Sequence, residues 1–558
     1  MFSRAQHRHF IFRRVGMALP SLAFAVGIAQ AAPPTAGSLL DTVRPQPALP
    51  AHDTSALPEA LVRPAIKLDN TVKVAVTAIR ITGVLAFKES ELQTLVSDAV
   101  GKELTLAELN EIAQRITRHY HQAGYLLARA YLPAQDIKGG VVEIAVLEGR
   151  LGKLSVENGS ALADTRVAAR LAGLKEGEAI DGAVLERNLL LLNDLPGVEV
   201  KSTLKPGASV GATDLDIQLG RRAPYAGSVE FDNYGNRYTG DLRLGASFSA
   251  GNLAGLGDTL ALRALASDGM EYGRVAWQAP VGNAGTQVGA AYSDMHYKLG
   301  KDFSSLDAHG TASIASLYVL HPFLRSRSSN INGQLNYDHK RLDDKVDSTA
   351  SSTSKTADVL TFGFSGDRVD GLAGGGLSNW SLAWITGQLK LDAANKVLDA
   401  AGHRTDGNYN KVVANVSRLQ ALVGGFNLYA NLQVQQAGKN LDSSEKMSLG
   451  GAFGVRAYPQ GEIAADDAVL ASLELRYAFA SAWQTSVFYD AGEGHLNHSP
   501  IAADGNNVRH ISGAGLGLTY SLPGDLSLQA TVAWRDGAQP TSDIDRNPRA
   551  WLQAIKRF

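Results

Sequence analysis

Two short motifs near the end of the chain contain an arginine and an aspartate that could form an ion pair. The first motif consists of Val455, Arg456, Ala457 and Tyr458, and the second contains Phe488, Asp490 and Gly492. A guanidinium group can bind a carboxylate through two parallel hydrogen bonds, so this pair would join the two segments if they met. Their spacing alone does not require contact, because an exposed arginine and an unrelated strand aspartate could be spaced in the same way.

The segments around these motifs indicate how they could meet. Alternation over 485–490 places Asp490 on the same face of a strand as Ser486 and Phe488. The loop from about 438 to 467 has glycines that allow it to fold back tightly, namely Gly450, Gly451, Gly454 and Gly461. If this loop enters a barrel, it would bring Arg456 to Asp490 in the lumen. A water-filled lumen would screen the charges and reduce the pair to about 1 kcal/mol.

The region 223–558 supplies the strands for such a barrel. Segments of about ten residues alternate between apolar and polar side chains; over 426–435, Phe, Leu, Ala, Leu and Val alternate with Asn, Tyr, Asn, Gln and Gln. A soluble β-sandwich also alternates, but strand length, even spacing and the terminal Phe558 favour a membrane β-barrel. We predict about sixteen antiparallel strands.

Two similar small modules precede this region, at 71–149 and 150–222. Each has the pattern of a strand, two helices and two further strands, which predicts two copies of one α+β fold. In the first module, Ser90 and Thr105 each begin a sequence typical of a capping box at the start of a helix. The second module ends at Arg221-Arg222, and we expect these arginines to hold it against the barrel or against lipid headgroups.

The N-terminal region indicates export from the cytoplasm. Several arginines precede an apolar run over 15–28 and an A-x-A sequence, which predicts a secretory signal peptide over 1–31. Residues 32–70 contain seven of the 19 prolines, so we expect a proline-rich linker there. One short helix, capped by Ser38 and ending before Pro45, fits within this linker.

Composition and motifs exclude several other classes of function. Lys and Arg total 53 against 55 Asp and Glu, a net charge of -2 that gives no support for nucleic-acid binding. The chain has no cysteine, so it has neither a disulfide framework nor a thiolate metal site. It also lacks a phosphate-binding G-x-x-x-x-G-K-[ST] loop and a recognisable nucleophile and base. We therefore predict no catalytic residue, no cofactor and no bound metal.

Taken together, these features resemble the outer-membrane transporters of two-partner secretion, also called haemolysin secretion and activation proteins. The resemblance rests on the two POTRA-like modules, on V-R-A-Y and F-Y-D-A-G, and on the segment D-N-Y-G-N-R-Y-T-G over 232–240 with Gly257-Asp258 after it. It covers essentially the whole chain after the signal peptide. The family's loop motif ends V-R-G-Y or V-R-G-F, so Ala457 departs from it, and alanine resists the positive φ that glycine adopts.

The resemblance implies a fold and a function. The fold is a sixteen-stranded barrel in the bacterial outer membrane, preceded by two periplasmic POTRA domains. The resemblance also implies that Arg456 pairs with Asp490 in the lumen and that a short helix at Ser38 could plug the pore. The function is to capture one large unfolded exoprotein in the periplasm and export it to the cell surface without nucleotide hydrolysis, which is two-partner (type V) secretion. The modules would bind the exoprotein by strand addition. Other expected partners are outer-membrane lipid and the barrel-assembly machinery that inserts the barrel, and we expect a monomer.

Two other classes of protein share some of these features. A barrel-assembly factor of the same superfamily would also have POTRA modules, but such proteins usually have more than two. A passive porin would have the barrel and lack the modules. An outer-membrane hydrolase is a third and more remote alternative, since the sequence offers no nucleophile with a base.

Overall fold

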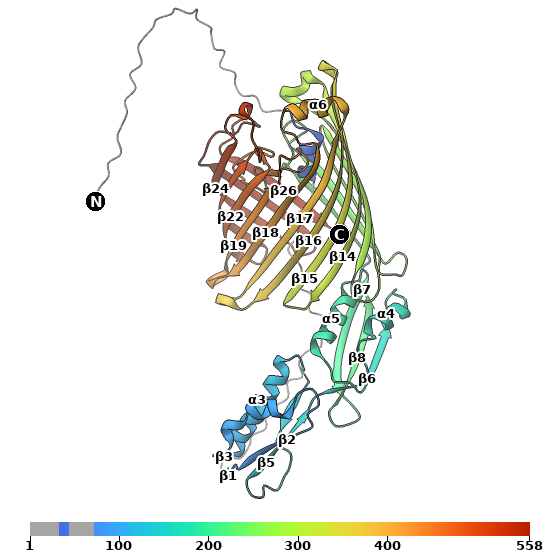
Figure 1. Cartoon of the computed structure of the whole chain (residues 1–558), viewed down its shortest axis with the longest axis vertical. Coiled ribbons are helices and arrows are strands. Elements are labelled where there is room, and N and C mark those ends of the chain that lie inside the picture. Colours follow the sequence, from blue (N-terminus) through green and yellow to red (C-terminus); the bar gives the residue numbers. More distant parts are fainter. Residues whose placement is uncertain (1–32, 44–71, 126) are drawn as a thin grey trace, which may run out of the picture.

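The computed structural model describes residues 33–43, 72–125 and 127–558, so the predicted signal peptide and most of the predicted linker lie outside the described residues. Two small α/β modules lie end to end below a large barrel (Figure 1). The α-helices of the described part are α1 (Ala36–Val43), α2 (Glu89–Thr94), α3 (Leu106–Gln122), α4 (Asp164–Leu171), α5 (Gly182–Asn193) and α6 (Ala393–Ala401).

Sixteen antiparallel strands close into one barrel, which confirms the predicted fold and strand number. Neighbouring strands in the sequence are neighbours in the sheet, and the last strand pairs with the first. The barrel strands are β9 (Tyr225–Asp232), β10 (Arg243–Gly251), β11 (Thr259–Ser267), β12 (Met270–Pro280), β13 (Gln287–Lys298), β14 (Ala308–Arg325), β15 (Ser329–Val346), β16 (Ser351–Asp370), β17 (Gly376–Leu391), β18 (Gly407–Ala421), β19 (Phe426–Ala437), β22 (Asp467–Ala480), β23 (Trp483–His495), β24 (Val508–Ser521), β25 (Leu526–Arg535) and β26 (Arg549–Arg557).

Apolar side chains cover the outside of the barrel, and many polar ones face its lumen. Leu473 and Val487 are 52% and 56% exposed, whereas Asp490 is 1% exposed. Leu473 pairs with Tyr489 in the neighbouring strand, and Tyr489 is also exposed. In a soluble sandwich these apolar faces would be buried, so the outward apolar surface identifies a membrane barrel.

Each module packs its helices against its own small sheet. The strands of the first are β1 (Lys73–Ala75), β2 (Ala78–Thr82), β3 (Glu103–Thr105), β4 (Arg129–Tyr131) and β5 (Val141–Leu147), and those of the second are β6 (Arg150–Asn158), β7 (Val198–Pro206) and β8 (Ala212–Arg221). The sheet orders are β2-β5-β4 and β6-β8-β7, with β1 and β3 forming a separate pair. In this part of the chain, each module has its own buried apolar cluster.

The two capping boxes have different outcomes. Thr105 and Glu108 form both reciprocal hydrogen bonds of a capping box at the start of α3, as predicted. The box at Ser90 is wrong, because α2 begins at Glu89 after Lys88 and no side chain caps it. Gln93, the expected fourth residue of that box, instead donates from Nε2 to the carbonyl of Ile79 in β2.

The second module is held against the periplasmic turns of the barrel by arginines that the sequence did not single out. Arg187 in α5 donates to three backbone carbonyls of the barrel, those of Pro322 (2.6 Å) and Phe323 (3.3 Å) near the end of β14 and that of Ala284 (3.0 Å) in the turn between β12 and β13. Arg325 at the end of β14 donates to both carboxylate oxygens of Asp194, at 2.7 and 2.8 Å.

The expected contact of Arg221 with the barrel is wrong, because this side chain bonds within its own module, while contact of these arginines with lipid headgroups stays a prediction. Arg221 Nε donates to the carbonyl of Gly159 within the same module, and Arg222 also donates to a residue of this module, Asn193. The reason is geometric: β8 ends at Arg221, beside its own sheet, whereas α5 faces the turns of the barrel.

Helix α1 lies inside the barrel, at the end remote from the modules (Figure 1). Its buried residues pack against an inward-facing apolar cluster on β11 to β15 that includes Leu265, Met295 and Leu342. The helix begins at Ala36, so the predicted cap at Ser38 is wrong. Thr35 precedes the helix and exchanges hydrogen bonds with Ser38, which lies within its first turn. No helix in the described ranges is long and apolar enough to cross a membrane.

The docking contacts generate a testable prediction. Arg187→Ala removes hydrogen bonds to three carbonyls, so the second module should separate from the barrel more often, and trypsin should cleave faster at the exposed Arg221-Arg222 junction. We expect an acceleration of about 5- to 30-fold, the factor that 1–2 kcal/mol represents. Arg187→Lys is the matched variant, because it keeps the charge but replaces the two guanidinium nitrogens that contact these carbonyls with a single ammonium nitrogen. Unchanged cleavage in Arg187→Ala would show that these contacts do not hold the module.

Candidate functional site in the barrel lumen

The loop between β19 and β22, residues 438–466, turns back into the barrel; we call it the inward loop. It carries a short two-stranded sheet of β20 (Met447–Ser448) and β21 (Ala464–Ala465). Several of its apolar side chains are buried with residues of the inner wall on β22 to β25. The inward loop therefore has a packed core of its own inside the lumen.

At the tip of this loop, Arg456 binds Asp490 of β23. Arg456 Nε and Nη2 donate to the two carboxylate oxygens of Asp490, each at 2.9 Å, and the backbone N–H of Arg456 also donates to this carboxylate at 3.1 Å. This is a bidentate pair, the strongest geometry for these two groups. The residues predicted to meet therefore do lie in contact.

Other residues complete this contact, and we call the group of Arg456, Ser472, Glu474, Phe488 and Asp490 the tip cluster. Glu474 in β22 accepts from Arg456 Nη1 at 2.9 Å, and Ser472 Oγ donates to Asp490 at 2.7 Å. The Phe488 ring lies 3.3 Å from the centre of the guanidinium, a cation–π contact.

The sequence pattern places Ser472 and Glu474 on the polar face of β22 but does not connect them with Arg456. Their polar character on the inward face was the only sequence feature that could have identified them as site residues. The sequence does not give the register between β22 and β23, which pairs Ser472 with Asp490 and Glu474 with Phe488. Trp551 in β26 adds a further contact, because its Nε1 donates to the backbone carbonyl of Arg456 at 2.7 Å.

The remaining predicted residues shape the tip. Val455 and Tyr458 are fully buried, and Tyr458 Oη donates to the carbonyl of Ala538. A side chain at Gly492 would lie 3.3 Å from Val455, so glycine allows the loop to approach β23 closely. Ala457 does not have a positive φ, and its methyl group occupies the space beside Gly513. Alanine therefore fits this tip without backbone strain.

The expected screening of the ion pair is wrong. The side chains of Arg456 and Asp490 are 12% and 1% exposed, so the loop excludes water from the contact. Removing one partner of a buried ion pair typically costs about 3–5 kcal/mol, because the other charge stays buried without compensation. We therefore expect the cost of a buried pair for Arg456 and Asp490, and not the value of about 1 kcal/mol that applies to an exposed pair.

A second group of charges holds the root of the inward loop; we call it the root cluster. It joins three lysines of the inner wall to two acidic residues of the loop, and its members are Lys340, Lys355, Lys411, Asp442 and Glu445. Lys355 Nζ lies 2.7 Å from Asp442, and Lys411 Nζ lies 3.1 Å from Glu445. The three lysine side chains are at most 8% exposed. The inward loop is thus fixed at both its tip and its root by buried ion pairs.

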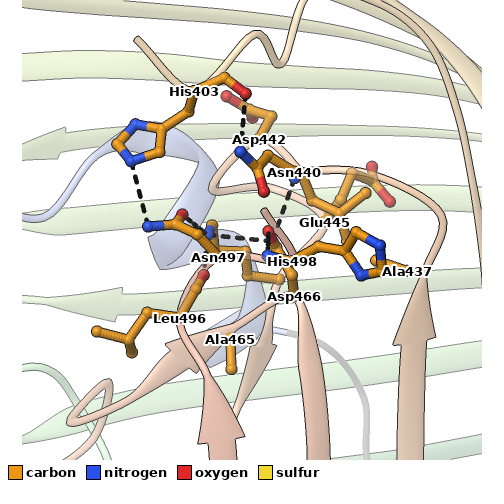
Figure 2. Close-up of polar contacts among 12 residues, drawn as sticks. His403, Ala437, Asn440, Asp442, Glu445, Ala465, Asp466, Leu496, Asn497 and His498 are labelled. Atoms are coloured by element: carbon orange, nitrogen blue, oxygen red, sulfur yellow. Dashed lines mark hydrogen bonds and ion pairs between the residues drawn. The ribbon is translucent and has the colours of Figure 1, made fainter. Parts of the chain in front are cut away.

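Uncharged and acidic side chains complete the root at the rim of the barrel. Asn440 donates to the carbonyls of His403 and Ser499, at 2.9 and 2.8 Å, which belong to two neighbouring loops. The fully buried Asp466 accepts the backbone N–H of His498 at 2.9 Å. Figure 2 shows Asn440 reaching His403 on one side and Asp466 beside His498 on the other. Loops that are distant in the sequence therefore meet at this root.

Helix α1 packs on the same root. The Thr35 hydroxyl lies 3.0 Å from the Ser443 hydroxyl, and a side chain at Gly37 would collide with Ser443 and Ser444. On its other side, the backbone N–H of Ala36 donates to Asp344 in β15 at 2.7 Å. The helix thus lies between the inward loop and the barrel wall, so its position depends on both.

The tip cluster generates a prediction about export. Arg456→Ala and Asp490→Ala should each strongly reduce secretion of the exported protein, and the double variant should be little worse than either, because coupled residues are not additive. Arg456→Lys is the matched variant, since it keeps the charge and loses the bidentate geometry. Secreted protein and outer-membrane level of each variant are measured together. Additive losses, or full secretion from Arg456→Ala, would show that the two residues do not act together.

The root cluster generates a second prediction, tested by exchanging charges. Lys355→Asp leaves two carboxylates facing each other and should displace the root of the loop, whereas Lys355→Asp with Asp442→Lys restores an ion pair. We expect the single variant to raise the ionic conductance of the purified barrel in a lipid bilayer and to impair export. The double variant should recover much of the original behaviour. If the exchange rescues neither property, direct pairing is not what matters at this position.

Comparisons with known proteins agree with the barrel and the two modules. Residues 211–520 match the family described as haemolysin secretion/activation protein ShlB/FhaC/HecB, and residues 74–149 match the ShlB-type POTRA domain. The heme/hemopexin transporter protein HuxB of Haemophilus influenzae is 31% identical over 484 residues, which are 84% of each chain. The outer membrane transporter CdiB of Dickeya dadantii is 24% identical over 509 residues, 85% of each chain.

A solved structure shows the same fold. CdiB from Escherichia coli superposes with a TM-score of 0.71 at 21% identity, covering 90% of this chain and 94% of that one. The family match spans more than half of the chain, and the similarity to HuxB extends over most of its length. The chain belongs to the ShlB/FhaC/HecB family of haemolysin secretion/activation proteins, the outer-membrane transporters of two-partner secretion.

Proposed function

We propose that this chain captures one large, unfolded exoprotein in the periplasm and passes it through its barrel to the cell surface. The observation that carries this proposal is a sixteen-stranded barrel whose lumen holds a separate segment, the inward loop, fixed by Arg456 and Asp490. A passive porin would not require two modules docked at one mouth of the barrel. The function is transport, and it assigns no catalytic role to any residue.

Capture is assigned to the edges of the module sheets. The outer strands, β2 and β4 in the first module and β6 and β7 in the second, each pair with only one neighbour in their sheets. An extended chain could add to such an edge through main-chain hydrogen bonds, which need little sequence specificity. This mode of binding suits an unfolded cargo, because it requires no folded surface on the partner.

The path through the barrel requires movement. Helix α1 and the inward loop both lie in the lumen, and they contact each other at Ser443 and Ser444. Passage of a chain would require α1 to leave its seat and the loop to shift. The sequence has no nucleotide-binding loop, so the proposed driving force is folding of the exoprotein outside the cell, which prevents its return.

We propose what kind of protein is exported, and we assign no activity to that exported protein. Relatives carry different names in this respect: HuxB is called a heme/hemopexin transporter and HpmB of Proteus mirabilis a hemolysin transporter. We propose a single secreted partner exoprotein, bound through the modules. Contact with outer-membrane lipid, insertion by the barrel-assembly machinery and a monomeric state complete the proposal.

Capture by the modules can be tested with a fragment of residues 72–222. Because each module has its own buried core, this fragment should fold in solution and bind the N-terminal part of the secreted partner exoprotein. Weak binding, in the micromolar range of about 8 kcal/mol or less, is expected for edge-strand contacts. An unrelated unfolded polypeptide of equal length serves as the control. A folded fragment that binds the cargo no better than this control would contradict capture by the modules.

A further inference from the structure

The inward loop is flanked by two loops that meet each other across its root. One spans 392–406, between β17 and β18, and includes α6 at the mouth remote from the modules (Figure 1). The other spans 496–507, between β23 and β24. In the order of the strands the inward loop lies between them, and they come together because it turns into the lumen. We call these two loops the strap.

The two halves of the strap contact each other directly. His403 Nε2 in the first half lies 2.8 Å from Asp504 Oδ1 in the second half and 3.2 Å from Asn497 Nδ2. Asn497 also donates from Nδ2 to Asp504 at 3.0 Å. The side chains of His403 and Asp504 are 38% and 11% exposed, so water reaches this contact only in part. The strap therefore passes from one side of the inward loop to the other.

Asn440 of the inward loop bonds to both halves of the strap. Its Nδ2 donates to the carbonyl of His403 in the first half at 2.9 Å and to that of Ser499 in the second half at 2.8 Å. Its Oδ1 accepts the backbone N–H of Ser499 at 2.6 Å. Figure 2 shows the amide directed at His403. The residue is 5% exposed, so its two donor hydrogens and its oxygen are bonded to the strap and withdrawn from water.

Only a carboxamide supplies this combination of donors and acceptor at this size. Aspartate would place a carboxylate against the carbonyl oxygens of His403 and Ser499, and an aliphatic side chain would leave two acceptors and one donor without this partner. The reversed orientation of the amide would face oxygen with oxygen, so the surrounding groups also fix its direction. A buried group whose partners all lie on two other loops specifies one position of the inward loop, which loose packing between loops would not do.

Charged groups of the inward loop bond to each half of the strap separately. Lys439 Nζ donates to the carbonyl of Asp406 in the first half at 2.8 Å. Lys446 Nζ donates to Asn497 Oδ1 in the second half at 3.0 Å. Asn440 bonds to both halves, so it is the contact at which the three loops meet.

We propose that Asn440 is a positioning residue of the transporter, which holds the inward loop in its closed position by fastening it to both halves of the strap. It acts through the loop and not by contact with the exported chain. Without its amide the loop loses the link between the two halves, so the root opens more often while Arg456 still holds the tip. The inference rests on the proposed function only for its effect on export, because the closed position can be measured on the empty barrel.

The ionic conductance of the purified barrel in a lipid bilayer tests the closed position without an exported protein. Asn440→Ala should raise the fraction of time spent in open states at least about fivefold, the factor that 1 kcal/mol represents. The physical reason is that the loop loses its three hydrogen bonds to the strap. An open fraction of Asn440→Ala equal to that of the wild type would overturn the proposal.

Asn440→Asp separates loss of these hydrogen bonds from general damage to the fold, because one inserted barrel is measured at two pH values. The ionised carboxylate repels both carbonyls, so the barrel should open often at about pH 8, whereas the protonated acid again donates a hydrogen and should restore much of the closed state at about pH 5. Other ionisable groups of the three loops at this position are His403, His498, Asp504, Asp466, Asp467, Lys439 and Lys446.

Titration of these other groups is measured with the wild type and with Asn440→Ala, which retain all of them. Asn408→Asp is the matched control and should follow the wild type, because Asn408 is exposed on β18 at the same mouth and lies outside the strap. If the open fraction of Asn440→Asp changes with pH no more than that of Asn440→Ala, the proposal is overturned.

Thiol labelling and secretion complete the test. The chain has no cysteine, and the buried hydroxyl of Ser448 in β20 has no hydrogen-bond partner among the described residues, so Ser448→Cys adds one thiol with little disturbance. A water-soluble maleimide should label this thiol faster when Asn440→Ala is added, and secretion of the partner exoprotein should fall at a normal outer-membrane level. Unchanged labelling, or full secretion from Asn440→Ala, would overturn the proposal. Failure of the wild type to export any exoprotein would instead contradict the proposed function, and conductance and labelling would then decide the inference.

Discussion

The buried ion pair between Arg456 and Asp490 is the constraint on which the interior of this barrel depends. Asp490 projects from the inner wall and is 1% exposed, so without the inward loop it would face an open lumen, and without Arg456 it would be a buried charge without a cationic partner. The loop must therefore return to this one position on β23. Phe488 and Glu474 restrict the arginine further, because one contacts the face of its guanidinium and the other its edge.

Once the tip is fixed, the inward loop organises the loop before β26. The carboxylate of Glu462, whose side chain is fully buried, accepts the backbone N–H groups of Thr541 and Ser542 and the guanidinium of Arg509. Tyr458 adds a bond to Ala538. A single loop thus connects β22 and β23 with the last strands of the barrel. The loop also contacts β26, one of the two strands that close the barrel, because Trp551 Nε1 donates to the carbonyl of Arg456.

The root cluster gives the same loop a second and separate attachment. Its wall lysines lie on β15, β16 and β18, whereas the tip contacts β22, β23 and β26. Helix α1 lies against the root through Ser443 and Ser444, so a displacement there would alter the seat of the helix even if Arg456 stayed bound. Two separate groups of ion pairs therefore hold the inward loop inside the lumen. At the other mouth, Arg187 fixes the second module by bonding to backbone carbonyls of the barrel, which positions the module without needing an opposite charge.

Sequence alone determined the properties that depend on neighbouring residues. The period of two over 426–435 identified barrel strands, because alternate side chains must face opposite sides of a sheet. The Thr105 capping box formed, since both of its partners lie within one turn. Tertiary structure decided the rest. Gln93 donates to the carbonyl of Ile79 and does not form the expected capping box. Glu474 contacts Arg456 only because the strand register places them together. The root lysines, too, meet Asp442 and Glu445 only after the barrel has closed, because their proximity comes from curvature of the whole sheet and not from local spacing.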